Sequence, residues 1–370
     1  VNGEIRVYKI MKILILANND VGLYQFRKEL IEELLKENNV LIACPDGELI
    51  RPLQEMGCLF YNTPVDRRGM NPKTDLKLFL TYIKLLKKEH PDLVIAYTIK
   101  PDVYGGYASS LFGIPYVENI TGLGTAFQKD GLLRKMVVIM YRISARKAKV
   151  VFFENKENRQ VFIKEKIVKQ EQTCLLNGAG VNLQHYTVQE YPGGTTVKFL
   201  FIGRVMQEKG IDELFQAMRI LISEGIDCSL DVLGGYEEDY RDIIEKYEKE
   251  GWLKYHGYKK DVRPYIKECH CFVLPSWHEG MANTNLECAA MGRPVITSKI
   301  HGCMEAVEDG ASGFLCEPQN TEDLIKIMRK FVGLSFEQRQ AMGLAGRKHM
   351  EAAFDKKKIV KKTMEKLESI

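Results

Sequence analysis

Two glutamates, Glu279 and Glu287, lie eight positions apart in a segment whose pattern predicts a strand, a loop and then a helix. The loop carries Glu279 and Gly280, and the helix begins near Asn283 or Thr284. The start of a helix offers unpaired N–H groups and the positive end of the helix dipole, which suit a diphosphate. Gly280 would let a ligand approach the backbone closely. Glu287, about one turn into the helix, is placed to accept hydrogen bonds from ribose hydroxyls, as an acidic residue does in dinucleotide-binding folds.

A second set of candidate residues lies about 75 positions earlier, again between a predicted strand and a predicted helix. Gly203 and Arg204 follow the strand, and Lys209 precedes the helix. A planar guanidinium and an ammonium group can both contact a phosphate, and two cations on a leaving diphosphate can stabilise its charge in place of a metal. The ordinary alternatives are a solvated basic loop and, for the glutamates, a simple turn in which Glu279 is solvated and Glu287 caps the helix.

The elements that must position these residues alternate between short apolar runs and helix-period segments. In the first half, strands are predicted at 12–17, 40–43, 93–96, 116–117 and 150–153, with helices at 23–36, 75–88 and 101–112. After the polar stretch 186–196, strands are predicted at 198–202, 229–233, 271–274 and 294–296, with helices at 211–223 and 284–291. Repeats of strand, helix and strand at this spacing predict right-handed crossovers on parallel sheets. The fold class is therefore α/β, with two Rossmann-like, doubly wound domains facing each other across a cleft.

The composition is that of a soluble globular protein. Of the 370 residues, 45% are hydrophobic and 28% are charged, and the length suits two domains. No run of about 18 apolar residues is present, so no membrane-spanning helix is predicted, and the first ten residues lack the features of a signal peptide. Residues 1–180 hold 27 Lys and Arg against 20 Asp and Glu, whereas the remainder holds 26 against 29. A basic first half suits an anionic surface or an acidic substrate.

The nine cysteines are odd in number and scattered, which favours reduced thiols in a cytoplasm over a disulfide framework. The run Cys269-His270-Cys271 has the residue types of a zinc site, but no second Cys or His pair completes a set of four ligands. We interpret this run as the start of a buried strand, and no metal site is predicted.

Taken together and in order, three segments resemble glycosyltransferase family 4, a large family of retaining enzymes with the GT-B fold. They are Gly203-Arg204 with Glu208-Lys209-Gly210, the pair Glu279 and Glu287, and the run Ala290-Met291-Gly292-Arg293-Pro294-Val295. The resemblance extends over most of the chain, from the strand at Met11 to the C-terminal helix. It implies that Arg204 and Lys209 bind the donor diphosphate, that Glu287 holds the ribose and that Glu279 faces the transferred sugar.

The same resemblance assigns the remaining donor residues. The backbone around Gly280, Met281, Ala282, Asn283 and Thr284 is implied to hold the phosphates or the sugar, beside the loop that Gly203 begins. Tyr258 lies where family members contact the base through the main chain. Gly22, in the first turn, would let the backbone come close to the donor diphosphate across the cleft. We expect Asp261, near Tyr258, to be a helix N-cap.

Two segments of the first half restrict the resemblance to one branch of this family. Residues 119–124 (NITGLG) and 68–72 (RGMNP) resemble a branch that extends lipid-linked sugars in capsule, O-antigen and glycan assembly. In that branch the acceptor is a saccharide linked to polyprenyl diphosphate. The resemblance to the other members of this branch favours a UDP-sugar as donor over a GDP-sugar. The candidates on the acceptor side are Arg68, Lys100, Thr121 and Gly122. Many family members carry a histidine at the position of Thr121, so the role of that histidine is not carried over to this chain.

A basic amphipathic helix is predicted within 132–149. Its apolar arc holds Leu132, Leu133, Met136, Val137, Ile139, Met140 and Ile143, and its opposite arc holds Arg134, Lys135, Arg142, Arg146 and Lys149. Such a helix can lie on an anionic bilayer, and the ordinary alternative is a surface helix that packs its apolar side inward. We expect a cytoplasmic protein that is peripheral on the inner face of the cell membrane and that has no nucleic-acid partner.

The predicted function is retaining transfer of a hexose or N-acetylhexosamine from a UDP-sugar to a polyprenyl-diphosphate-linked saccharide in bacterial surface polysaccharide or glycan synthesis. It would need no metal or other cofactor. Front-face transfer and double displacement through a covalent intermediate are both open. The alternatives are a nucleotide-sugar epimerase of the same architecture and a non-catalytic nucleotide-binding or scaffold subunit. A dehydrogenase is disfavoured because no G-x-G-x-x-G motif follows either first strand.

Domain boundaries follow from the break in the pattern. We predict an acceptor-binding domain at 11–187 and a domain that binds the nucleotide sugar at 196–353. The stretch 354–370 has the pattern of a basic, partly apolar helix. The resemblance implies that this helix crosses back onto the first domain.

Overall fold

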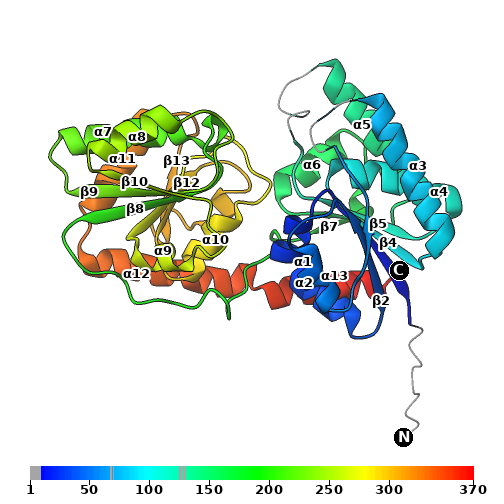
Figure 1. Ribbon diagram of the computed structural model, residues 1–370. Helices are drawn as coiled ribbons and strands as arrows, with labels where there is room; N and C mark the ends of the chain where they lie inside the picture. The colour runs from blue at the N-terminus through cyan, green and yellow to red at the C-terminus, as the bar shows by residue number, and fades with distance from the viewer. Residues whose placement is uncertain (1–9, 67–68, 70, 125–126, 128–130) are drawn as a thin grey trace, which may run out of the picture. The chain divides into compact units, whose positions relative to one another are not determined.

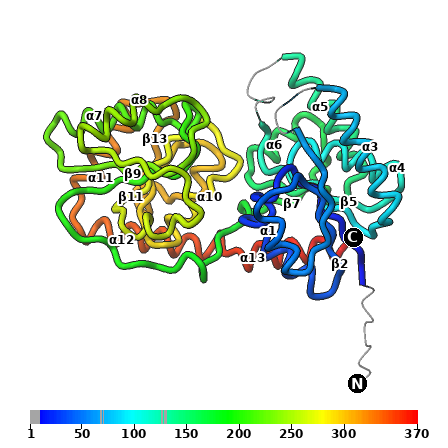
Figure 2. The backbone as a smooth tube through the Cα atoms, viewed as in Figure 1, coloured from blue at the N-terminus to red at the C-terminus, as the bar shows by residue number. Residues whose placement is uncertain are grey.

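The computed structural model describes residues 10–66, 69, 71–124, 127 and 131–370. The chain divides into two compact units, one formed by residues 1–179 together with 357–370 and the other by residues 180–356 (Figures 1 and 2). Each unit contains one parallel sheet with helices packed against it.

The first unit is built on a seven-stranded parallel sheet with the strand order β3-β2-β1-β4-β5-β6-β7. Its strands are β1 (Lys12–Leu16), β2 (Asn39–Cys44), β3 (Leu59–Asn62), β4 (Leu93–Tyr97), β5 (Tyr116–Ile120), β6 (Val150–Phe153) and β7 (Thr173–Leu175). Its α-helices are α1 (Asp20–Leu35), α2 (Ile50–Glu55), α3 (Pro72–Glu89), α4 (Gly106–Phe112), α5 (Leu132–Ser144), α6 (Lys156–Lys164) and α13 (Lys356–Glu368). Shorter helical turns are η1 (Pro101–Gly105), η3 (Ala145–Lys147) and η4 (Gln170–Gln172).

Alternation along β1 shows why helices cover both faces of this sheet. Ile13 and Ile15 belong to a core that includes residues of α1, α2 and α13, whereas Leu14 and Leu16 belong to a core that includes residues of α3, α4 and α5. Successive side chains of a strand point to opposite faces. A continuous apolar run is therefore what a strand in a doubly wound parallel sheet requires.

The second unit is built on a six-stranded parallel sheet with the strand order β10-β9-β8-β11-β12-β13. Its strands are β8 (Val197–Ile202), β9 (Cys228–Leu233), β10 (Leu253–Gly257), β11 (Cys271–Leu274), β12 (Val295–Ser298) and β13 (Gly313–Cys316). Its α-helices are α7 (Ile211–Ser223), α8 (Arg241–Lys249), α9 (Arg263–Glu268), α10 (Asn283–Ala290), α11 (Thr321–Val332) and α12 (Phe336–His349), with shorter turns at η5 (Gln207–Lys209), η6 (Met304–Ala306) and η7 (Met350–Phe354). The strand order reverses between β8 and β11, and doubly wound sheets bind ligands at the carboxyl ends of the strands at such a reversal.

The division into units differs from the expected boundaries in one respect. Residues 180–187 and 354–356 belong to the second unit. The reason is that Val181 is buried in the second core and donates its N–H to the Phe354 carbonyl at 2.8 Å. The helix that follows, α13, belongs to the first unit, because its side chains Ile359 and Leu367 are buried in the core of that unit.

Four strands were not expected from the sequence, and all four lie at the edges of the sheets: β3, β7, β10 and β13. An edge strand has a neighbour on one side only, so it is less completely buried than a central strand. Two of the four residues of β3 are exposed and the other two are half-buried, whereas every residue of β4 is buried. β3 consequently lacks the long apolar run that marks a buried strand, whereas β13 is apolar and largely buried but spans only four residues.

Candidate functional site

The loops at the carboxyl ends of β8 and β11 contact each other closely and are joined by hydrogen bonds. The first loop ends at Gly210, whose φ of 71° lies in the left-handed region, and a Cβ there would lie 2.1 Å from the carbonyl oxygen of Pro275 on the second loop. The Glu208 carbonyl accepts the N–H of Trp277 at 3.0 Å and the hydroxyl of Ser276 at 3.2 Å. Glycine is therefore required where the loops touch, and the contact fixes the side chains on either side of it.

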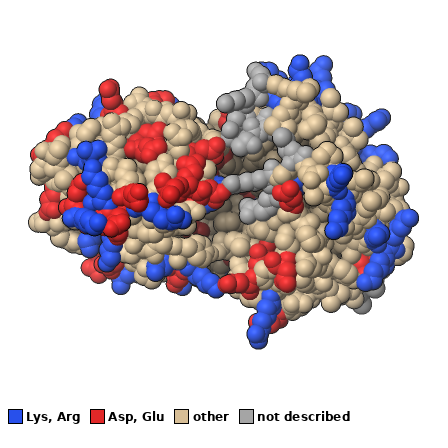
Figure 3. Space-filling model, turned by 45° about the horizontal axis from the view of Figure 1, so that its top comes forward, with Lys and Arg blue, Asp and Glu red and all other residues tan. Residues whose placement is uncertain are grey.

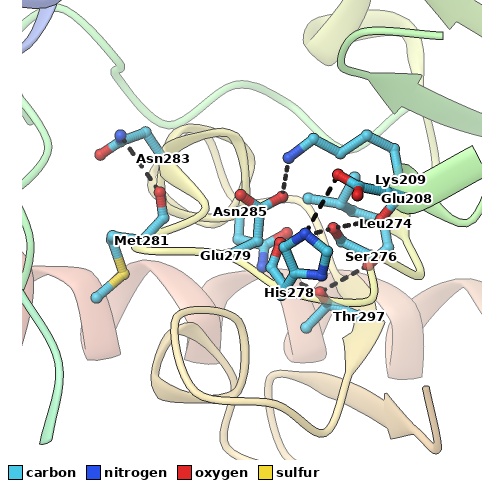
Figure 4. A network of polar contacts seen from close by, with 10 residues as sticks. All are labelled: Glu208, Lys209, Leu274, Ser276, His278, Glu279, Met281, Asn283, Asn285 and Thr297. Atoms are coloured by element: carbon cyan, nitrogen blue, oxygen red, sulfur yellow. Dashed lines mark hydrogen bonds and ion pairs between the residues drawn. The ribbon is translucent and has the colours of Figure 1, made fainter. Parts of the chain in front are cut away.

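This contact brings Lys209 and Glu279 together as an ion pair (Figure 4). Both side chains are largely buried, with exposed fractions of 16% for Lys209 and 13% for Glu279. Their sequence neighbours Glu208 and His278 form a second contact between the same loops, at 3.2 Å from the carboxylate to Nε2. The sequence predicted two separate donor contacts. The structure joins them, so a bound diphosphate would have to share Lys209 with Glu279 or displace this carboxylate from it.

Arg204 lies on the first loop but its guanidinium has a different partner. Its Nη1 lies 3.3 Å from Oε2 of Glu237, and the Arg204 side chain is 48% exposed. Exposed pairs of this kind contribute about 1 kcal/mol or less, so the guanidinium can exchange this carboxylate for a more strongly charged group. Gly203, just before it, donates its N–H to the Leu233 carbonyl at 2.9 Å.

The N-terminus of α10 supplies most of the backbone donors that the sequence predicted. No side chain caps this helix, and the N–H groups of Met281, Asn283 and Thr284 have no acceptor among the described residues. The N–H of Ala282 is an exception, because it donates to the Gly302 carbonyl at 2.7 Å. Unpaired N–H groups at a helix start form a site for an anion.

Glu287 lies about one turn into α10. Burial raises the pKa of Glu287 to about 7, although the influence of the Tyr186 hydroxyl and the charge of Lys356 both lower it. Sequence analysis missed Tyr186, which lies in the segment that enters the second unit. Its only signal was that it is one of two tyrosines in a mostly polar stretch, HYTVQEYPGGTT.

The other predicted donor residues lie in loops, except for one. Tyr258 directly follows β10 and is 62% exposed, and Gly280 lies between Glu279 and the start of α10. Gly22, in the first unit, lies inside α1, and its N–H donates to the Asn19 side chain at 2.5 Å. The expectation of a turn at Gly22 was therefore wrong, because Asn19 caps the helix earlier than its apolar pattern begins.

The expected N-cap at Asp261 was also wrong by one position. The N-cap of α9 is Val262, which makes no side-chain capping bond. Asp261 nevertheless accepts the N–H of Arg263 in the first turn at 3.1 Å.

The acceptor-side candidates belong to the first unit. Lys100, which follows β4, donates to the Asp75 carboxylate of α3 at 2.6 Å and to the carbonyl of Gly69, in the loop before α3, at 2.7 Å. Its charge is thus paired within the unit. Thr121 and Gly122 directly follow β5 and are half-buried. Arg68 lies outside the described residues.

All nine cysteines are buried and carry free thiols. Across the part of the chain that the structure describes, no cluster of three or more His, Cys, Asp or Glu side chains has an arrangement suited to a metal ion. In the Cys269–Cys271 run, Nδ1 of His270 accepts the N–H of Lys198 at 3.1 Å. This histidine therefore joins the starts of β8 and β11.

Two family models match the chain, one in each half. Residues 12–155 match the model described as glycosyl transferase 4-like, and residues 189–349 match the model described as glycosyl transferases group 1. The second match includes Arg204, Lys209, Glu279 and Glu287.

Curated relatives resemble the chain over most of its length. The N,N'-diacetylbacillosaminyl-diphospho-undecaprenol alpha-1,3-N-acetylgalactosaminyltransferase of Campylobacter jejuni is 25% identical over 85% of this chain and 87% of that protein. The UDP-Gal:alpha-D-GlcNAc-diphosphoundecaprenol alpha-1,3-galactosyltransferase of Escherichia coli is 28% identical over 78% of each chain.

Solved structures share the fold. Anabaena HepE, in complex with UDP and glucose, gives a TM-score of 0.81 at 18% identity and covers 97% of this chain and 100% of that chain. The sucrose-phosphate synthase of Thermosynechococcus elongatus gives 0.80 at 16% identity over 97% and 98% of the two chains. At these identities the likeness concerns the fold alone. With both family models matched, the chain belongs to the group 1 and 4-like glycosyltransferases, and its two Rossmann-like units form the GT-B fold.

Proposed function

We propose that this glycosyltransferase moves a hexose or an N-acetylhexosamine from a UDP-sugar to a saccharide linked to polyprenyl diphosphate, in the synthesis of a bacterial surface polysaccharide or glycan. The observation that carries the proposal is the similarity, over 78% to 85% of the chain, to two relatives whose names give diphosphoundecaprenol-linked sugars as acceptors. One name also gives a UDP-sugar as donor. Both give an α linkage in the product, which corresponds to retention when the nucleotide sugar is α-linked.

The donor loops support transfer without a metal ion. As the glycosidic bond stretches, negative charge grows on the leaving β-phosphate, and Lys209, Arg204 and the unpaired N–H groups at the start of α10 are the groups that would stabilise it. Glu279, beside Lys209, would orient hydroxyls of the sugar. The acceptor hydroxyl would attack from the face that the diphosphate leaves, and a phosphate oxygen would take its proton. Double displacement on a protein nucleophile is the alternative route to the same stereochemistry.

We also propose that the first unit contacts a membrane through α5. Its apolar side chains divide into two groups, and Val137 belongs to the buried group. Leu132, Met136, Ile139 and Ile143 are exposed, with fractions between 47% and 85%. Because they recur every three or four residues, they form one row along the outside of the helix. This exposed row is an apolar surface that packing within the unit leaves uncovered.

Basic side chains accompany the exposed row. Lys135, Arg142 and Arg146 are all exposed. Figure 3 shows Lys and Arg side chains at several places on the surface of the first unit. Apolar side chains flanked by cations are what a helix in the interface of an anionic bilayer requires. No described helix is long and apolar enough to cross a bilayer. The proposed attachment is peripheral, on the inner face of the cell membrane.

The test of the transferase proposal is a panel of UDP- and GDP-sugars, offered with and without polyprenyl-diphosphate-linked acceptors in the presence of EDTA. We expect one UDP-sugar to give a lipid-linked product extended by one sugar, with the anomeric configuration of the donor. A product that forms only when divalent metal is restored would contradict the metal-independent mechanism. Conversion of the free nucleotide sugar without an acceptor would support an epimerase instead.

A further inference from the structure

The loop that carries Glu279 rests on a neighbouring loop, residues 299–306, which follows β12. A Cβ at Gly302 would lie 2.6 Å from the carbonyl oxygen of Glu279 and 2.7 Å from that of Gly280, and the φ of Gly302, 90°, lies in the left-handed region. The Gly302 carbonyl also accepts the N–H of Ala282 at 2.7 Å. Glycine is therefore required at this contact, and the backbone of residues 279–282 is held against it.

The helix that follows this backbone, α10, has an anchor of its own. The side-chain amide of Asn285 donates to the Thr297 hydroxyl at 3.1 Å, and this hydroxyl donates to the Leu274 carbonyl at 2.8 Å (Figure 4). All three residues are buried, so α10 is joined to the ends of β11 and β12 independently of the loop before it. The contact with Gly302 acts on that loop, where Glu279 lies.

Glu305, in the turn η6, holds Gly302 in place. One oxygen of its carboxylate accepts the N–H of Gly302 at 2.7 Å, and the other lies 2.7 Å from Nδ1 of His301. The Glu305 carbonyl accepts a hydrogen bond from Nε2 of His349, in α12, at 2.8 Å. The Glu305 side chain is 24% exposed. Both carboxylate oxygens thus contact residues of one short loop, and the backbone of Glu305 is tied to a helix behind it.

We propose that Glu305 is a positioning residue for the transfer reaction: it holds Gly302 in place, and Gly302 in turn fixes the backbone of Glu279. The inference rests on the proposed function, because it takes Glu279 as the carboxylate that orients hydroxyls of the transferred sugar. Misplacing a group by about 1 Å can lower a rate about 10²-fold. A carboxylate in a neighbouring loop can therefore control turnover through the backbone that it supports.

The test is a double-mutant cycle of Glu305→Ala and Glu279→Gln in the full-length chain, measured with the nucleotide sugar and lipid-linked acceptor that give a product in the panel of donors. We expect Glu305→Ala alone to lower kcat about tenfold or more. The affinity for UDP in calorimetry should stay within about threefold, because Lys209 and Arg204 lie on the other loop. On the Glu279→Gln background the same substitution should lower kcat about twofold or less, because the carboxylate that Glu305 positions is already absent.

Two further variants separate positioning from a general loss of structure. Glu305→Gln should keep kcat within about threefold of the wild type, since its amide oxygen can still accept the Gly302 N–H. His301→Ala removes the other contact of Glu305 and should lower kcat about threefold, with the same dependence on Glu279. Because His301 is partly exposed, this variant carries the test if Glu305→Ala does not fold.

Glu308→Ala is the matched control. Its carboxylate is three positions further along the chain, is 56% exposed and lies 3.7 Å from Nδ1 of His349, so its removal should change kcat less than about twofold. A loss of kcat that is equal with and without Glu279→Gln, or equal in Glu308→Ala, would overturn the positioning role alone. Wild-type turnover in Glu279→Gln would instead remove the role of Glu279 on which the inference rests. A panel in which no sugar is transferred would refute the proposed function and the inference with it.

Discussion

Lys209 and Glu279 form an ion pair between two loops. If Lys209 binds the donor diphosphate as we propose, the diphosphate has to compete with Glu279 for the ammonium group. Both groups are largely buried, which strengthens their attraction but also makes a lone charge at this place costly. A diphosphate carries more negative charge than one carboxylate and can replace it as the partner of Lys209. Glu279 would then be released toward the hydroxyls of the transferred sugar.

Glu279→Gln separates these roles, because it keeps the shape of the side chain and removes its charge. We expect turnover to fall roughly 10²-fold or more, while the affinity for UDP stays equal or rises because Lys209 loses its internal partner. Steady-state kinetics and calorimetry measure the two effects. Glu208→Gln, which alters the contact with His278 between the same loops, is the control and should keep turnover within about threefold. Wild-type turnover in Glu279→Gln would show that this carboxylate has no role in transfer.

The candidate site was predictable where residue type and spacing carry the information. Lys209, Glu279 and Glu287 follow strands at positions that suit a diphosphate and a ribose, and the structure places them around the same pair of loops and the start of α10. The pairing of Lys209 with Glu279 had no local signal, because 70 positions separate them. Tyr186 was missed for a similar reason, since its influence on Glu287 depends on how the segment before β8 returns to α10.

Among the elements, the segment between the two sheets is anchored by a buried cation, Arg293. The side chain is fully buried, and burial lowers its pKa. Its Nη2 donates to the Glu190 carbonyl at 2.7 Å and to the Lys267 carbonyl at 2.8 Å, and its Nε donates to the Ile266 carbonyl at 2.9 Å. One guanidinium thus ties the end of α9 and the segment before β8 to the start of β12.

Arg293→Met fills similar space but leaves these carbonyls without their donor. Unsatisfied buried polar groups cost about 1–3 kcal/mol each, so we expect the free energy of unfolding of the second unit to fall by about 3 kcal/mol or more. Urea denaturation followed by tryptophan fluorescence measures the change, because both tryptophans, Trp252 and Trp277, lie in this unit. Arg329→Met breaks an exposed pair with Glu224 and should have little effect. An equal loss in both variants would refute the anchoring role of Arg293.

The exposed row on α5 predicts a loss of membrane binding without a loss of stability. Replacing Ile139 and Ile143 together with Gln removes apolar surface that would be buried in the bilayer, at roughly 25 cal/mol per Å². We expect co-sedimentation with vesicles containing anionic lipid to weaken about tenfold or more, while the melting temperature stays constant because both side chains are exposed. Leu344→Gln, at an exposed position of α12, is the control. Unchanged vesicle binding in the double variant would exclude this face as the docking surface.

Most central strands were predictable because both of their faces are buried, which demands continuous apolar runs such as those of β1 and β4. The edge strands were not predictable in this way, because β3 and β10 have partly exposed faces and mixed sequences. The boundaries of the second unit were not predicted from the sequence, for another reason. Its first residues are held by backbone bonds from Val181 to a segment about 170 positions later, and no local pattern records such a contact.

At the scale of the whole molecule, two acids buried in the first unit contribute to the way in which the stability of that unit changes with pH. Asp102 and Glu118 are fully buried. Burial raises the pKa of both carboxyls, and the charge of Glu118 raises that of Asp102 further. The backbone of α4 packs closely against this pair, since a Cβ at Gly106 would lie 2.7 Å from Oε1 of Glu118. The folded chain therefore favours the protonated acids.

Because their pKa values are raised in the folded state above unfolded values of about 4, the folded state binds more protons than the unfolded state between the two. The stability contributed by protonation is fully present below about pH 4 and is lost as pH rises toward the folded pKa values. We expect the free energy of unfolding of the first unit to fall in urea titrations as the pH rises from about 4 to about 8, the pKa of Glu118 in the folded state. Glu118→Gln should flatten this slope, whereas Glu171→Gln, at an exposed position, should not. The same slope in Glu118→Gln as in the wild type would contradict this account.

The position of α13 in the chain has a consequence for synthesis on the ribosome. Ile359 and Leu367 close the sheet face that carries Ile13 and Ile15, yet the whole second unit, residues 180–356, is made in between. At about 5–20 residues per second, this interval lasts roughly 10 to 35 seconds. Throughout this interval α1 and α2 can already pack on the face, but the part of it that α13 covers stays exposed. The first unit is therefore begun before the second unit and completed after it, and this exposed patch is where a chaperone would bind the growing polypeptide.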